Sequence, residues 1–115
     1  MSPEYLAGFI DGEGCIRISG TSPYLSLTNR SLPGLLEIQE AFGGNVRPSG
    51  NGVQRYEAYG DRAVKILHHV YRHLREKQPQ ARLVMSFPST EPGSHERDMI
   101  LRALRDLKRV TYGEA

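Results

Sequence analysis

The chain has 115 residues, of which 38% are hydrophobic and 24% charged, and its formal net charge is +2. This length allows one domain at most, no apolar run approaches the ~20 residues of a membrane-spanning helix, and the N-terminus lacks a signal-peptide pattern. The one cysteine, Cys15, excludes an internal disulfide framework and fits a reducing compartment. We therefore expect a soluble intracellular protein of the cytoplasm, nucleoid or an organelle matrix.

A first helix is predicted over about residues 3–12. Ser2 can cap it, and Pro3 suits the first helical position. Gly8 and Gly12 lie four residues apart and so share one face of this helix. Glycine inside a helix costs about 1 kcal/mol relative to alanine, which favours close approach of another backbone as the reason. The alternative is that Gly12 belongs to the end of the helix and Gly8 alone needs explaining.

An acidic side chain, Glu13, follows at the C-terminal end of this helix. Helix C-termini carry unpaired carbonyls and partial negative charge, which disfavours a carboxylate there. The arrangement makes sense if a cation binds beside Glu13 and the Gly12 carbonyl. Carboxylate and carbonyl oxygens suit a hard divalent ion such as Mg²⁺.

Two hairpins and four further helices follow in chain order. Alternating apolar and polar residues predict the strands, the Asn51-Gly52 pair is typical of a hairpin turn, and spacings of three and four predict the helices. The strands are expected at residues 14–20, 24–29, 45–47 and 53–59, with a turn over 48–52, and the helices after caps at Ser31, Asp61 and Ser94 and from residue 78 to about 87. This order predicts an α+β fold in which helices cover one face of a four-stranded, mostly antiparallel sheet.

The other sheet face is expected to be free and to bind nucleic acid. Arg supplies most of the fifteen basic residues, and its rigid fork matches phosphates and guanine edges. Alternation leaves open whether Gln54 or Arg55, and Tyr56 or Glu57, lie on this face. The alternative is an ordinary solvated sheet face. The residues we expect to contact DNA are Arg17, Ser19, Ser26, Arg30, Arg47 and Arg55.

Residues 6–14, LAGFIDGEG, resemble the motif of the LAGLIDADG homing endonucleases, with changes at Phe9, Gly12 and Glu13. Weaker similarity continues through the second strand, the Gly43-Gly44 turn and residues 73–84. The resemblance implies the αββαββα fold with an antiparallel four-stranded DNA-binding sheet plus C-terminal helices. Residues 1–87 would form the endonuclease core, and residues 88–115 a linker and a peripheral helix of the same domain.

The resemblance also implies roles for individual residues. Glu13, where the family more often has Asp, would bind a catalytic Mg²⁺ together with the Gly12 carbonyl, with Mn²⁺ as a substitute. Lys77 would stabilise charge at the scissile phosphate, and Asn29 would order solvent near the metal. From the residues alone, Lys77 could instead be a solvated loop lysine and Asn29 a turn former. Asp11, in the last turn of the first helix, is interpreted as structural.

A chain with one such motif is expected to act as a homodimer. The interface would use Leu6, Gly8, Phe9 and Gly12, would bring two Glu13 side chains together for two-metal hydrolysis, and would suit a roughly palindromic target. The implied function is that of a site-specific double-stranded DNA endonuclease of a mobile genetic element. The alternative is a catalytically silent DNA-binding regulator or an intron RNA maturase of the same fold.

Overall fold

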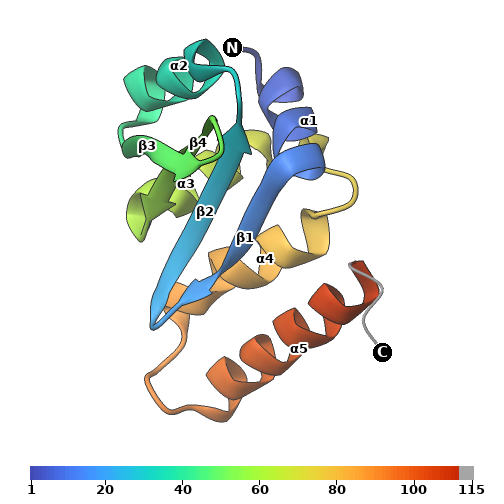
Figure 1. The fold of residues 1–115 in the computed structure, drawn as a ribbon. Coiled ribbons are helices and arrows are strands. Elements are labelled where there is room, and N and C mark those ends of the chain that lie inside the picture. Colours follow the sequence, from blue (N-terminus) through green and yellow to red (C-terminus); the bar gives the residue numbers. More distant parts are fainter. Residues whose placement is uncertain (112–115) are drawn as a thin grey trace.

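The computed structural model describes residues 1–111, with side chains for residues 1–108. A four-stranded antiparallel sheet in the order β1-β2-β4-β3 forms its centre, and helices cover one of its faces (Figure 1). This architecture confirms the predicted fold class. The elements in chain order are α1 (Pro3–Glu13), β1 (Gly14–Ser19), β2 (Ser22–Asn29), α2 (Leu32–Phe42), β3 (Asn45–Gly50), β4 (Val53–Tyr59), α3 (Asp61–Val70), α4 (Gln78–Ser86) and α5 (His95–Thr111), with short 3-10 turns at Tyr71–His73 and Phe87–Ser89.

Local hydrogen bonds define several helix starts as predicted. The Ser2 hydroxyl accepts from the Tyr5 amide at 3.1 Å, and the Ser94 hydroxyl accepts from the Arg97 amide at 3.1 Å. Ser31 takes the predicted cap position of α2, although its side chain makes no capping hydrogen bond. The predicted cap of α3 is wrong. Asp61 is the first residue of α3 rather than its cap, because Gly60 takes the cap position.

The second hairpin is tighter than predicted. Strand β3 continues to Gly50, so that Asn51 and Gly52 alone form the turn, with φ angles of 54° and 76°. Positive φ at both central residues is what a type I′ turn requires. Pro48 lies within β3, and the strand tolerates it because β3 is at an edge of the sheet.

The core lies between the sheet and helices α1, α2, α3 and α4. Leu25 and Leu27 of β2, with Tyr56 and Ala58 of β4, point into it and are essentially unexposed. Because side chains alternate along a strand, Arg55 and Glu57 point to the opposite face. The structure thereby settles the two alternatives that the sequence left open in β4.

Helix α5 packs against α4 and lies beyond the edge strand β1 (Figure 1). Side chains of β1, α4 and α5 line a groove between them. Within the described residues, none of the helices is long and apolar enough to cross a membrane.

Candidate active site and nucleic-acid interface

Glu13 is positioned by the junction between α1 and β1. The helix ends at Glu13, and Gly14 enters β1 with extended backbone. A side chain at Gly14 would place its Cβ 2.7 Å from the Ile10 carbonyl oxygen, closer than any real Cβ contact. Glycine is therefore required where the helix passes directly into the strand, and this tight passage leaves Glu13 exposed at the helix end.

Asn29 holds the Glu13 carboxylate from the end of β2. The Asn29 amide nitrogen donates to Glu13 Oε2 at 3.1 Å, and the Asn29 amide oxygen accepts from the Ser31 backbone N–H at 2.8 Å. The second contact fixes the orientation of the amide, so Asn29 fulfils the turn-forming role and contacts Glu13 as well. Glu13 and Asn29, which are sixteen residues apart in the sequence, are thus brought together.

A small hollow of about 350 Å³ surrounds this pair, lined by Glu13, Thr28, Asn29, Arg30 and Val53. The Arg30 guanidinium donates to the Asn51 carbonyl at 2.9 Å in the β3–β4 turn. Three residues predicted for the site, Glu13, Asn29 and Arg30, therefore line one exposed hollow. Its size suits water, an ion or a phosphate oxygen.

Lys77 lies close to residues 6–14, but its ammonium contacts the Asp11 backbone and not Glu13. Its ammonium donates to the Asp11 backbone carbonyl at 2.5 Å, and the side chain is mostly buried. The Asp11 carboxylate accepts from the backbone amides of Arg75 at 2.8 Å and Lys77 at 3.0 Å. Asp11 therefore holds the segment before α4, as the structural interpretation expects. Lys77 reaches the end of α1 without lining the hollow around Glu13.

The oxygen donors of one chain fit a divalent ion only in part. Among the described residues, no group of three or more His, Cys, Asp and Glu side chains could hold a metal ion. Mg²⁺ is commonly bound by one or two carboxylates, with waters and substrate phosphates completing its octahedron. Glu13 beside the Gly12 carbonyl fits such a site if a second chain and a phosphate supply the remaining ligands.

One face of α1 is open. Gly8 and Gly12 are exposed, and a Cβ at either position would meet no atom within 4 Å. Tyr5, on the same face, is 65% exposed. We call Tyr5, Gly8 and Gly12 the exposed strip. Nothing within the described chain explains these two glycines by close packing.

The structure places Leu6, one of the predicted interface residues, in the core of its own chain. Its side chain is 2% exposed and packs in the core with Ala7 and Ile10, on the side of α1 that faces away from the exposed strip. Phe9 is half-buried and points toward Gly34 of α2, which leaves part of its ring available.

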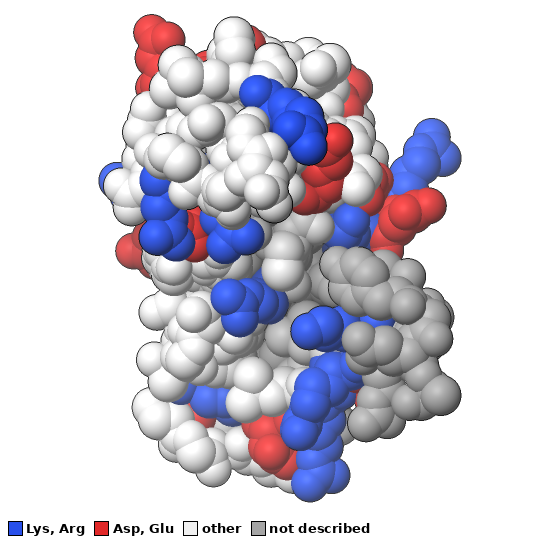
Figure 2. Space-filling model, viewed as in Figure 1, with Lys and Arg blue, Asp and Glu red and all other residues white. Residues whose placement is uncertain are grey.

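The uncovered sheet face carries arginines from three strands. Arg17 of β1, Arg47 of β3 and Arg55 of β4 lie on it, and Ser19 lies on the same side of β1. Together with Tyr24, Glu57 and Tyr59, these residues form what we call the polar face. Figure 2 shows this side of the molecule, with Lys and Arg side chains over the sheet and along α5. Arg55 Nε is buried with no hydrogen-bond partner in the described part of the chain.

Ser26, one of the predicted DNA contacts, lies low on the polar face. Ser26 points to the polar face but is only 8% exposed. Its short side chain lies between Cys15 and Glu57 on the neighbouring strands. A ligand on this face would meet the longer side chains first.

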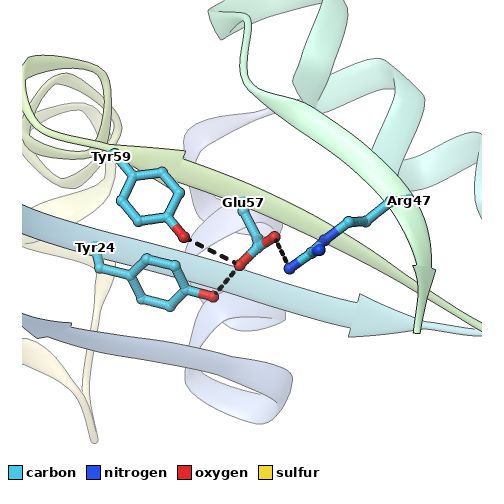
Figure 3. Close-up of polar contacts among 4 residues, drawn as sticks. All are labelled: Tyr24, Arg47, Glu57 and Tyr59. Atoms are coloured by element: carbon cyan, nitrogen blue, oxygen red, sulfur yellow. Dashed lines mark hydrogen bonds and ion pairs between the residues drawn. The ribbon is translucent and has the colours of Figure 1, made fainter. Parts of the chain in front are cut away.

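Glu57 is the centre of a polar cluster on this face (Figure 3). Its carboxylate accepts from the hydroxyls of Tyr24 at 2.5 Å and Tyr59 at 3.4 Å, and pairs with the Arg47 guanidinium at 2.7 Å. The Tyr24 hydrogen bond, followed by the positive charge of Arg47, lowers the pKa of Glu57 below its ordinary value despite burial. Sequence reasoning did not find this cluster, because it depends on the register of three strands.

A second basic region lies in the groove between β1, α4 and α5, which has a volume of about 590 Å³. Its cations are Arg17, Lys77, Arg105 and Lys108, with Leu101 and Leu104 among its apolar lining and no acidic side chain among the described residues that line it. The sequence predicts only a peripheral helix here, because no local pattern shows which strand α5 faces.

No protein-family model matches the sequence, and no curated protein matches it. Solved structures do. The homing endonuclease I-CvuI, in complex with its target in the presence of Ca, gives a TM-score of 0.69 at 20% identity over 98% of this chain and 95% of I-CvuI.

Two further structures differ in length. The homing endonuclease I-TnaI gives a TM-score of 0.67 at 18% identity, covering 100% of this chain and 99% of its own. The LAGLIDADG meganuclease I-AabMI, bound to uncleaved DNA, gives 0.63 at 24% identity, covering 91% of this chain and 44% of its own. The chain therefore has the fold of LAGLIDADG homing endonucleases, as predicted from residues 6–14.

Proposed function

We propose that the chain is a divalent-metal-dependent, site-specific endonuclease that cuts a roughly palindromic double-stranded DNA target as a homodimer. A fold alone does not determine an activity. The observation that carries the proposal is the exposed Glu13 carboxylate, held by Asn29 at the helix end beside a sheet face rich in arginine. Such a protein would act inside the cell and belong to a mobile genetic element.

The polar face would bind the duplex. A two-stranded ribbon or a sheet can enter the major groove, where arginine forks recognise base edges and phosphates. Arg17 and Arg47 are exposed there, on opposite edge strands of the sheet. The DNA-bound structures of I-CvuI and I-AabMI support a nucleic-acid ligand for this fold.

The residues at the end of α1 would perform the chemistry. Glu13 and the Gly12 carbonyl would hold Mg²⁺ or Mn²⁺, and the bound ion would supply an activated water and charge neutralisation at the phosphate. Asn29 keeps the Glu13 carboxylate in place. Lys77 would stabilise charge on the phosphate, which requires its ammonium to leave the Asp11 carbonyl or to share its protons with the ligand.

The exposed strip of α1 would form the dimer interface. Exposed glycines let two backbones approach closely, and Gly8 and Gly12 have open space where a Cβ would stand. A two-fold axis along this strip would bring two Glu13 side chains together, and their repulsion would be relieved by a cation. The near-complete coverage of I-CvuI and I-TnaI fits one copy of the fold per chain.

One observation favours the alternative of binding without cleavage. The Lys77 ammonium is occupied by a backbone carbonyl and lies outside the hollow around Glu13. A catalytically silent DNA-binding regulator, or an intron RNA maturase, would need no cation there.

A plasmid library with randomised inserts, incubated with the protein and Mg²⁺, tests the proposal. We expect the wild type to linearise a subset of plasmids. We expect Glu13→Gln to bind the same subset in a gel shift without cutting it. Binding without cleavage by the wild type would favour the alternative. Absence of both binding and cleavage would refute the DNA-directed function.

A further inference from the structure

Glu57 places a negative charge on a face proposed to meet DNA. The residue is 6% exposed, and its carboxylate is held by two tyrosine hydroxyls and one guanidinium. A carboxylate near phosphates weakens binding to any nucleic acid. Its presence beneath the arginines therefore needs a reason other than affinity.

The contacts of Glu57 connect the whole sheet, as Figure 3 shows in part. Tyr24 comes from β2, Tyr59 from β4 and Arg47 from β3. Arg17 of β1 joins through Tyr24, since its guanidinium carbon lies 4.5 Å from the centre of the Tyr24 ring. The Tyr24 ring also packs against Tyr59, with 4.9 Å between centroids. Two arginines are thus ordered through one carboxylate.

Both arginines stay accessible while they are held. The Arg47 side chain is 60% exposed, although one of its terminal nitrogens pairs with Glu57. An arginine whose fork is ordered before binding suits the two acceptors on a guanine edge, whereas a phosphate is bound as well by a mobile cation. Stability alone does not call for a charge at this position, because apolar residues often replace a buried ion pair without loss.

We propose that Glu57 is a positioning residue for base recognition: it holds Arg47 directly, and Arg17 through Tyr24, so that their guanidiniums meet guanine edges in the major groove of duplex DNA. The inference rests on the proposed function. If Glu57 has this role, its carboxylate reduces the affinity for all DNA and increases the discrimination between DNA sequences.

The test compares two duplexes, one selected by the wild type from a randomised library and one of the same composition in scrambled order. For Glu57→Gln we expect tighter binding to the scrambled duplex and a loss of discrimination of about tenfold, within the range that one bidentate base contact provides. Glu40→Gln, the same change at an exposed position on α2, should leave discrimination unchanged.

A second variant keeps the charge and removes the fork. Arg47→Lys alters an exposed side chain, so folding is not at risk. It should lose discrimination while keeping the affinity for the scrambled duplex. Adding Glu57→Gln to Arg47→Lys should cause a smaller loss than Glu57→Gln causes alone, because the contact with the Arg47 fork is already gone and only the ordering of Arg17 through Tyr24 is left to lose. If circular dichroism shows that Glu57→Gln does not fold, the discrimination of Arg47→Lys between the two duplexes is the test of the proposal.

The outcomes separate this inference from the proposed function. Unchanged discrimination in Arg47→Lys, or equal weakening of both duplexes in folded Glu57→Gln, would overturn the positioning role while wild-type recognition stands. A wild type that selects no preferred duplex would instead refute the site-specific function itself.

Discussion

We expect the basic side chains in the groove between β1 and α5 to contribute measurably to the affinity for DNA. Arg105 and Lys108 of α5 line it together with Arg17 and Lys77. Four cations without an acidic neighbour among the described lining residues should attract the phosphate backbone as it leaves the polar face. We predict that Arg105→Gln combined with Lys108→Gln weakens binding to all duplexes alike.

The magnitude follows from counterion release. Each neutralised phosphate contributes about −0.9 to the slope of log affinity against log salt concentration. Two contacts per chain in a homodimer make four, so the double variant should flatten the slope by about 3.6. Between 50 and 200 mM salt, the wild type should consequently lose about a hundredfold more affinity than the variant.

Fluorescence anisotropy with a labelled duplex over a salt series provides the measurement. Arg102→Gln is the matched control, since Arg102 lies on the same helix, pairs with Asp98 at 3.1 Å and does not line the groove. Its slope should stay close to that of the wild type. Coincident slopes for the wild type and the double variant would refute the reasoning, as would an equal effect of the control.

Four further outcomes are expected. Glu13→Gln should abolish nicking in Mg²⁺ but retain binding in Ca²⁺; nicking at the wild-type rate would disprove the metal assignment. Gly8→Leu should convert a dimer into a monomer by sedimentation, since overpacking costs about 1–3 kcal/mol, and a wild type that is monomeric at micromolar concentration would contradict the interface. Tyr56→Phe should lower the free energy of unfolding by about 1 kcal/mol, because the Tyr56 hydroxyl donates to the Gly43 carbonyl at 2.7 Å, and an unchanged denaturant midpoint would speak against that bond. The pKa of Glu57 is lower in the folded chain than its ordinary 4.5, so the ionised carboxylate stabilises the fold above pH 4.5, and this stabilisation is lost as the pH falls below 4.5. The difference in melting temperature between the wild type and Glu57→Gln should therefore shrink as the pH is lowered through this range. A difference that stays constant would be inconsistent with this linkage.

The sequence by itself determined the features that depend on near neighbours in the chain. The order of elements, the caps at Ser2 and Ser94 and the turn at Asn51 and Gly52 all follow from hydrogen bonds or dihedral angles spanning a few residues. The position of Glu13 at a helix end is local in the same sense. Its role in cleavage, like the division into residues 1–87 and 88–115, stays a prediction.

Tertiary structure decided which side chains meet. Leu6 and Gly8 are both compatible with an apolar helix face, and only packing against the sheet places Leu6 in the core. The cluster around Glu57 needs the register of β2, β3 and β4, and the contact between Lys77 and Asp11 joins residues 66 apart. Such contacts arise from chain closure over long separations, which no local pattern encodes, and they determine which of the predicted cations remain free to reach a ligand.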